Sequence, residues 1–367
     1  MKKILISLAV VLVSATGIAQ KKYPLLIGTY TNSCESAGIY AYEFDAETGA
    51  FLFKSSSKNV QNPSYLTVSP DGKTIYSVNE NGANSQVSSF DWNAATGKID
   101  FRNAKPAMGA DPCHIINDEK NVIAANYSGG NIAVFGKQSG GSLTDAKQVI
   151  QHEGHSVNAQ RQESPHVHMV HFSPDKKFVL ANDLGTDRLY VYDYAADANS
   201  PLRLKDTVPT KTGGGPRHLA FSPNGLHVYL LHELDGALTV FNYKNGTLRR
   251  IQETSVVPAG FSGSTSAADL HLSADGKFLY ATNRGDANTI SVFSVDARGK
   301  LAHQQTLPSG GKGPRNFAID PTGKYVLVAH QYSNDIIVFE RDQATGLLKN
   351  TGKKLELCAP VCLVFAP

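Results

Sequence analysis

Ionisable side chains recur at two positions of a phrase that the sequence repeats. Each copy is a short apolar run, a turn of proline, aspartate and glycine, and a second apolar run, as in HLAFSPNGLHVYLLHELDG from His218. Six residues before the turn position, or nine or ten after it, several copies carry a polar residue: Ser64, Glu80, His168, Asp183, Arg217, Glu233, Arg284, Arg315 and His330. Charged groups in a confined site are costly unless they pair with one another or bind a ligand. These positions are therefore candidates for a functional site.

The charged residues at these positions suit proton transfer and the binding of an anion. Glu233 and His168 form a natural pair for moving a proton. Arg217, Arg284 and Arg315 would hold a carboxylate or phosphate, or stabilise a developing oxyanion, because a guanidinium donates parallel hydrogen bonds. A structural alternative stays open, in which these side chains form a ring of salt bridges around a central shaft.

Further polar residues are candidates for contacts with the hydroxyl groups or the anionic group of a substrate: Asn126, His166, Asp183, His218 and Arg315. His166 and His168 would lie on one side of a strand, as two ligands of a metal could. No Asp, Glu or Cys set nearby completes such a site, and the arginines would repel a cation. We therefore predict no metal and no cofactor.

The stretch TGGGPRHLAFSPNG, from Thr212 to Gly225, resembles a phosphate-binding loop only in its glycines. It precedes an apolar run that is typical of a strand, and it has neither the Gly-x-Gly-x-x-Gly spacing nor the Lys-Ser/Thr pair of such loops. We interpret it as a tight turn that directs Arg217 into the same site as Arg315, His168 and Glu233.

The repeated phrase predicts the elements that position these residues. Its turns fall 46 to 56 residues apart, and residues 20–367 divide into seven units of about 50. Hairpins rich in Val, Ile, Tyr and Phe at this period are typical of β-propeller blades. We therefore predict an all-β, seven-bladed β-propeller that forms a single domain. The two polar positions of each hairpin would meet at one end of the shaft, because paired antiparallel strands begin and end side by side.

The two ends of the sequence complement each other. The last copy, PVCLVFAP, stops after one strand, and the stretch from Tyr23 begins with the strands that this copy lacks. We predict that the C-terminal strand completes the N-terminal blade and closes the ring, which removes exposed sheet edges. Cys34 and Cys358 would then lie at the same rim, so we predict a disulfide between them, with free thiols as the alternative.

The first nineteen residues predict a secretory signal peptide. Lys2 and Lys3 precede an apolar run over residues 4–13, and Gly17 and Ala19 suit a cleavage site. A periplasmic or secreted protein follows, without a membrane anchor after the signal is removed. The net charge of +3 is small and the charges are mixed along the chain, which argues against nucleic-acid binding. A monomer is favoured.

The sequence resembles the propeller-type lactonases, the family of 6-phosphogluconolactonases of this fold and of carboxymuconate lactonising enzymes. The likeness spans nearly all of residues 20–367 in motifs such as NPSYLTVSPDGKTIYSVNE, GGGPRHLAFSPNG, SADGKFLYATNRG and GPRNFAIDPTGKYVLVAHQ. It implies metal-independent hydrolysis, or reversible cyclisation, of a sugar-acid or carboxylic-acid lactone. The substrate would be a small anionic sugar lactone.

The resemblance also implies site residues, since the muconate-type site uses a histidine, a glutamate and two arginines. The matching residues are His168, Arg217, Glu233 and Arg284. Glu233, alone or with His168, would act as the general base on water, and the arginines would stabilise the oxyanion. His168 would be an alternative donor of the proton that the ring oxygen takes up as its bond breaks. An exported protein would act on an external lactone. A muconate-type cyclase and a non-catalytic propeller that binds sugar acids or serves as an envelope scaffold are the alternatives.

Overall fold

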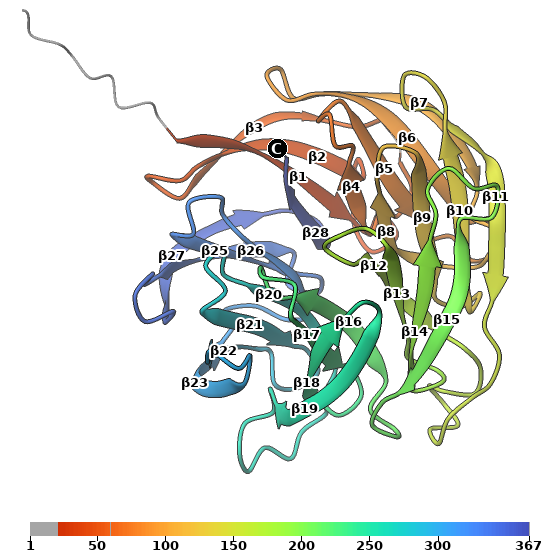
Figure 1. Cartoon of the computed structure of the whole chain (residues 1–367). Coiled ribbons are helices and arrows are strands. Elements are labelled where there is room, and N and C mark those ends of the chain that lie inside the picture. The colour runs from red at the N-terminus through yellow and green to blue at the C-terminus, as the bar shows by residue number, and fades with distance from the viewer. Residues whose placement is uncertain (1–20, 59, 367) are drawn as a thin grey trace, which may run out of the picture.

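The computed structural model describes residues 21–58 and 60–366, which form seven four-stranded antiparallel sheets around a central axis (Figure 1). The prediction of an all-β, seven-bladed β-propeller is confirmed. The only helical element of the described residues is a short 3-10 turn, η1 (Gly82–Asn84). In this part of the chain we find no helix with the length and apolar character that a membrane crossing requires. The predicted signal peptide, residues 1–19, lies outside the described residues and stays a prediction.

The strands of each blade follow one another in chain order from the axis outwards, except that blade 1 begins with the C-terminal strand. Blade 1 contains β28 (Pro360–Phe365), β1 (Lys22–Thr29), β2 (Ile39–Asp45) and β3 (Ala50–Ser56). Blade 2 contains β4 (Leu66–Val68), β5 (Thr74–Asn79), β6 (Gln86–Asn93) and β7 (Lys98–Pro106). Blade 3 contains β8 (Pro112–Asn117), β9 (Asn121–Asn126), β10 (Asn131–Lys137) and β11 (Leu143–Gln151). Blade 4 contains β12 (Val167–Phe172), β13 (Phe178–Asp183), β14 (Arg188–Tyr194) and β15 (Leu202–Pro209).

The remaining three blades repeat this order. Blade 5 contains β16 (Pro216–Phe221), β17 (His227–His232), β18 (Ala237–Lys244) and β19 (Thr247–Ser255). Blade 6 contains β20 (Ala267–Leu272), β21 (Phe278–Asn283), β22 (Thr289–Val295) and β23 (Leu301–Pro308). Blade 7 contains β24 (Pro314–Ile319), β25 (Tyr325–His330), β26 (Asp335–Arg341) and β27 (Leu348–Glu356).

Apolar side chains fill the gaps between neighbouring blades. Alternate residues of a strand point to opposite faces of its sheet. In β1, Leu25 and Ile27 accordingly pack against blade 7, where Leu327 belongs to the same cluster, while Leu26 packs against blade 2 beside Ile75. Similar clusters fill the other five gaps, so the core is a ring of seven interfaces. This ring holds the inner strands at fixed distances around the shaft.

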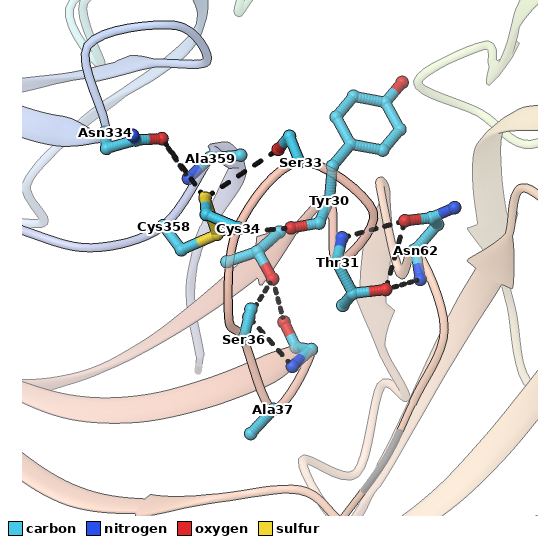
Figure 2. The surroundings of a disulfide bond; sticks show 12 residues. Tyr30, Thr31, Ser33, Cys34, Ser36, Ala37, Asn62, Asn334, Cys358 and Ala359 are labelled. Carbon is cyan, nitrogen blue, oxygen red and sulfur yellow. Dashed lines mark hydrogen bonds between the residues drawn. A yellow bond between two sulfur atoms is a disulfide. The ribbon is translucent and has the colours of Figure 1, made fainter.

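The ring closes as the sequence predicts. In Figure 1 the C-terminal strand β28, in blue, lies beside β1, in red, and the two pair antiparallel with Leu26 opposite Val364. Cys34 and Cys358 form a disulfide across 324 residues, just beyond the end of β1 and just before β28 (Figure 2). The predicted closure and the predicted disulfide are confirmed, and the ring is joined both by a strand and by a covalent bond.

Candidate functional site

A cavity of about 380 Å³ opens at the end of the shaft where the inner strands of blades 2 to 7 begin. Eleven side chains from these blades and the loops beside them form its walls: Glu80, Asp111, Cys113, Tyr127, Arg161, His168, Glu233, Ser266, Arg284, Arg315 and Tyr332. Six of them are arginine, aspartate or glutamate, so the cavity is strongly charged. It is the end of the shaft at which the sequence places the two polar positions.

β-Bulges point several of these side chains toward the shaft. In four blades the pairing of the inner strand with the second strand shifts register across one residue, which is Cys113 in β8, His168 in β12, Arg217 in β16 and Arg315 in β24. An extra residue in one strand locally re-aims its side chain, and bulges are common beside active sites. These four residues therefore depart from the simple alternation of a strand.

The four residues that the resemblance implies lie in contact with one another. Glu233 follows β17, and its Oε2 lies 3.0 Å from Arg217 Nε, 3.1 Å from Arg284 Nη2 and 3.7 Å from His168 Nε2. All four side chains are buried. Arg217 is the most enclosed, since it lies beneath Glu233 in the shaft and its Nη1 donates to the carbonyl oxygen of Ala268.

Three arginines hold Glu233 in its ionised form. Burial by itself would raise the pKa of this carboxyl group, because a buried charge loses its solvation. The charges of Arg284, Arg217 and Arg161 outweigh that effect and lower the pKa to about 2. Glu233 is therefore a carboxylate at neutral pH, and it is a weak base.

His168 has the opposite character, because it is held neutral. Burial lowers its pKa well below the ordinary value, and the positive charge of Arg217 acts in the same direction. Its imidazole is thus uncharged at neutral pH and is available to accept a proton from a molecule in the cavity.

Arg161 is a site residue that the sequence analysis did not select. It belongs to the loop between β11 and β12, and its Nη2 donates to Glu233 Oε1 (2.7 Å) and to the hydroxyl of Tyr127 (3.1 Å). This loop covers residues 152–166. Its place outside the repeated phrase gave no register by which to choose one residue.

Two arginines, Arg284 and Arg315, line the cavity. Arg284 Nη2 is ion-paired with Glu233 Oε2 at 3.1 Å, but among the described residues it makes no aligned hydrogen bond. Its Nε donates to the carbonyl oxygen of Ser266 (3.0 Å), which fixes the guanidinium in place. On the other wall, Arg315 lies over the ring of Tyr30, 5.4 Å from its centre. Both cations are placed to meet an anionic group.

Glu80 lies on the same wall as Arg315. Its Oε2 accepts a hydrogen bond from the hydroxyl of Tyr30 (2.8 Å), and its Oε1 accepts one from the hydroxyl of Ser64. Glu80 falls at one of the two polar positions of the repeat, although the sequence analysis gave it no catalytic or substrate-binding role. The cavity thus contains two buried glutamates with different partners.

Asn126 and Asp183, predicted as substrate contacts, are fully buried and do not line the cavity. Asn126 Nδ2 donates to the carbonyl oxygen of Ala107 (3.0 Å) and to Asn131 Oδ1 (2.5 Å). Asp183 Oδ1 accepts from the backbone N–H of His166 (2.8 Å), and its Oδ2 lies 2.8 Å from His152 Nδ1. Both side chains hold neighbouring loops, because their polar atoms point into the blade rather than into the shaft.

His166 and His218, the other two predicted contacts outside the cavity lining, lie next to it. The His166 ring stacks on Tyr127 at 4.5 Å between ring centres, and it therefore supports a cavity wall. His218 lies deeper in the shaft, where its Nδ1 is 2.8 Å from Asp269 Oδ1 and its ring is 5.4 Å from that of His168. The bulge at Arg217 explains the difference, since Arg217 and His218 both reach the shaft but at different depths.

Three more findings concern the remaining described residues. Within residues 21–58 and 60–366, no three His, Cys, Asp or Glu side chains form a group that could hold a metal ion. A hollow of about 550 Å³ lies by the β4–β5 turn, and its Arg102 is paired with Asp91. Another of about 470 Å³ at the opposite end of the shaft is lined mainly by apolar residues. Among these hollows, the 380 Å³ cavity combines arginines, a neutral histidine and the carboxyl groups of Glu80, Asp111 and Glu233.

Comparison with known proteins gives a consistent result over nearly the whole chain. The family model described as "Lactonase, 7-bladed beta-propeller" matches residues 24–365. A 6-phosphogluconolactonase of Bacillus subtilis is 33% identical over 356 residues, which cover 94% of this chain and 98% of that protein. One of Formosa agariphila with the same name is 32% identical over 339 residues, covering 90% and 96%. A solved structure, the periplasmic gluconolactonase of Pseudomonas aeruginosa, has a TM-score of 0.90 and 38% identity, and covers 94% of this chain and 99% of its own.

Proposed function

Because the chain belongs to the seven-bladed β-propeller lactonase family, we propose that it hydrolyses the lactone of a sugar acid in the 380 Å³ cavity. The relatives named 6-phosphogluconolactonase and gluconolactonase support this substrate class. The reaction adds water to the lactone carbonyl and opens the ring to a hydroxy acid. It uses no metal and no cofactor.

The observation that carries the proposal is the buried guanidinium of Arg284, which lines the cavity and whose Nη2 is ion-paired with Glu233 but makes no aligned hydrogen bond. A ligand oxygen in the cavity would supply the hydrogen bond that this buried donor lacks. The carbonyl oxygen of a lactone becomes negative as water adds, so a donor of this kind stabilises the tetrahedral intermediate more than the substrate. Arg315 and Arg161 supply further positive charge for a carboxylate or phosphate on the sugar.

The contacts of the two candidate groups assign the base. Both oxygens of Glu233 already accept hydrogen bonds from Arg161 and Arg217, so this carboxylate has little capacity left to take a proton from water. Its pKa of about 2 acts in the same direction. We therefore assign to Glu233 the task of holding Arg161, Arg217 and Arg284 in place. His168, whose neutral Nε2 faces Glu233, accepts the proton of the attacking water, and Glu233 stabilises the imidazolium that forms.

Export of the protein would decide which lactones it meets. The predicted signal peptide and the periplasmic relative support a periplasmic or secreted enzyme. Such an enzyme acts on external sugar lactones, with or without a phosphate group.

The proposal is tested by titration at constant pH of the acid that ring opening releases. Purified residues 20–367 are assayed with gluconolactone and with 6-phosphogluconolactone, and the spontaneous rate is subtracted. We expect hydrolysis of at least one of the two, with the ratio of the kcat/KM values showing whether the arginines hold a phosphate. No rate above the spontaneous one for both lactones contradicts the proposed function.

A further inference from the structure

The two glutamates of the cavity have partners of different chemistry. The side chains that bond Glu233 are guanidinium groups, which donate hydrogen bonds and cannot accept them. Those that bond Glu80 are the hydroxyls of Tyr30 and Ser64, which can do either. The arginine partners of Glu233 can therefore form hydrogen bonds to both of its oxygens only while the carboxyl group is ionised. The hydroxyl partners of Glu80 can form hydrogen bonds to its carboxyl group in the ionised and in the protonated state.

The surroundings of Glu80 also favour its protonated form. Burial raises the pKa of Glu80, and the neighbouring carboxylate of Asp111 raises it further. Arg315 and the hydrogen bonds from Ser64 and Tyr30 lower it, but the pKa stays above its ordinary value. Cys113 and Tyr332 also line the cavity, and burial raises the pKa of the Cys113 thiol, so this group stays neutral.

The position of Glu80 suits a second proton transfer. Glu80 belongs to blade 2 and Glu233 to blade 5, and three blades is the largest separation that a ring of seven allows. A substrate in the cavity would present its carbonyl carbon to His168, and the ring oxygen bonded to that carbon to Glu80, since both side chains line the same cavity. Glu80 also borders a second cavity of about 330 Å³, which Tyr30, Asn32, Gln331 and Tyr332 line with hydroxyl and amide groups. The hydroxyl-bearing chain released from the ring has room there.

We propose that Glu80 is a further catalytic residue, the general acid that protonates the ring oxygen when the lactone opens. This inference rests on the proposed function. Water first bonds to the carbonyl carbon while His168 takes one of its protons. As the carbonyl re-forms, the bond from carbon to ring oxygen breaks, its electron pair goes to that oxygen, and the Glu80 carboxyl group supplies the proton. His168 then releases its proton to solvent, and the Glu80 carboxylate takes up a proton from solvent, so both side chains return to their starting states. The product acid loses its own proton.

The test is the pH dependence of kcat/KM for the lactone that the wild-type protein hydrolyses. A required acid gives a limb in which activity falls as the pH rises through its pKa. We expect Glu80→Gln to lower kcat/KM by about 100-fold or more and to remove this alkaline limb, because an amide cannot supply the proton. Glu80→Asp should restore part of the rate and the limb. Glu233→Gln should lower the rate by a similar factor and keep the limb.

Two further variants keep the result interpretable. Tyr30→Phe removes a hydrogen bond that stabilises the Glu80 carboxylate, so the alkaline limb should move to higher pH even if Glu80→Gln does not fold. Glu119→Gln changes an exposed glutamate that pairs with Lys176 beside the turns, and it should leave rate and profile unchanged. The inference is overturned if the wild type hydrolyses the lactone while Glu80→Gln keeps its rate within threefold, or keeps the alkaline limb. It is equally overturned if the limb does not move in Tyr30→Phe. A wild type without lactonase activity contradicts the proposed function instead.

Discussion

The two ends of the blade hairpins satisfy their polar groups in different ways. At the turn end, bonds are local: Ser222 Oγ donates to Asn224 Oδ1 (2.7 Å) and accepts from the backbone N–H of His227 (2.9 Å). At the cavity end, Glu233 of blade 5 contacts Arg284 of blade 6 and Arg161 from a loop 72 residues away. A short segment can complete the first arrangement, and only the closed ring can complete the second. Substitutions at the turn end should therefore alter stability, and those at the cavity end activity.

The largest effect should follow from the loss of a cavity arginine. Arg284→Ala removes the proposed oxyanion donor, and we expect kcat/KM for the hydrolysed lactone to fall by about 10²- to 10³-fold, as for other oxyanion donors. Arg203→Ala on the outer strand of blade 4 is the matched control, because its side chain is 84% exposed. Equal activity of the two variants, with both folded by circular dichroism, would contradict the role of Arg284.

Loss of the disulfide should lower both stability and activity, because this bond fastens the cavity end of the ring. Its loop carries Tyr30, and the backbone N–H of Thr31 donates to Asn62 Oδ1 (Figure 2). Asn62 Nδ2 in turn donates to the carbonyl oxygen of Glu80. We expect the Cys34→Ser, Cys358→Ser double variant to lose about 2–4 kcal/mol of unfolding free energy in denaturant. Activity at 25 °C should fall as well. The control is the double variant Cys113→Ser, Cys362→Ser, which changes two buried free cysteines and should not alter the response of the protein to a reducing agent.

The histidines of the shaft and the aspartates of the turns should contribute to the unfolding free energy over different pH ranges. His114, His168 and His218 each have a pKa below the ordinary value of 6.5, so they bind fewer protons in the folded than in the unfolded protein. Their contribution to the unfolding free energy is complete above pH 6.5 and is lost as the pH falls below it. His271, whose pKa is raised beside Asp269, acts in the opposite direction but is a single group.

The turn aspartates titrate at lower pH. Asp71, Asp175 and Asp275 have pKa values below their ordinary 3.8, so their contribution is lost only as the pH falls below that value. Denaturant unfolding at pH 7, 6, 5 and 4 should show stability decreasing from the first step onward. A constant free energy of unfolding between pH 7 and pH 5 would show that the shaft histidines do not stay neutral.

The smallest effect should come from a single turn. Ser222→Ala removes the hydroxyl that joins Asn224 to the backbone of His227, and we expect a loss of about 1 kcal/mol in unfolding free energy. The kcat/KM should be unchanged, because this turn lies at the far end of the hairpin from Glu233. A fall in kcat/KM at full stability would show that the two ends are coupled.

The fold was predictable because its signals are local and repeated. A turn in which a serine hydroxyl donates to the side chain two residues later, such as Ser69 to Asp71, recurs at the same place in several blades. The residue that follows in this turn has a left-handed φ, which is 71° at Gly72 and 52° at Lys176, the equivalent residue of blade 4. Alternating apolar residues give the strands, and the unmatched strand at the C-terminus predicts how the ring closes. The convergence of His168, Arg217, Glu233 and Arg284 follows from their shared register in these repeats.

The tertiary structure alone decided how these residues are used. Arg161 comes from a loop without register, and bulges at His168, Arg217 and Arg315 change the direction of their side chains, which periodicity cannot reveal. Asn126 and Asp183 occupy the predicted positions, yet they bond residues of neighbouring loops instead of lining the cavity. Which glutamate is held ionised depends on whether arginines or hydroxyls surround it. A repeat places a residue at the rim of the shaft, but distances across the closed ring determine its partners and therefore its chemistry.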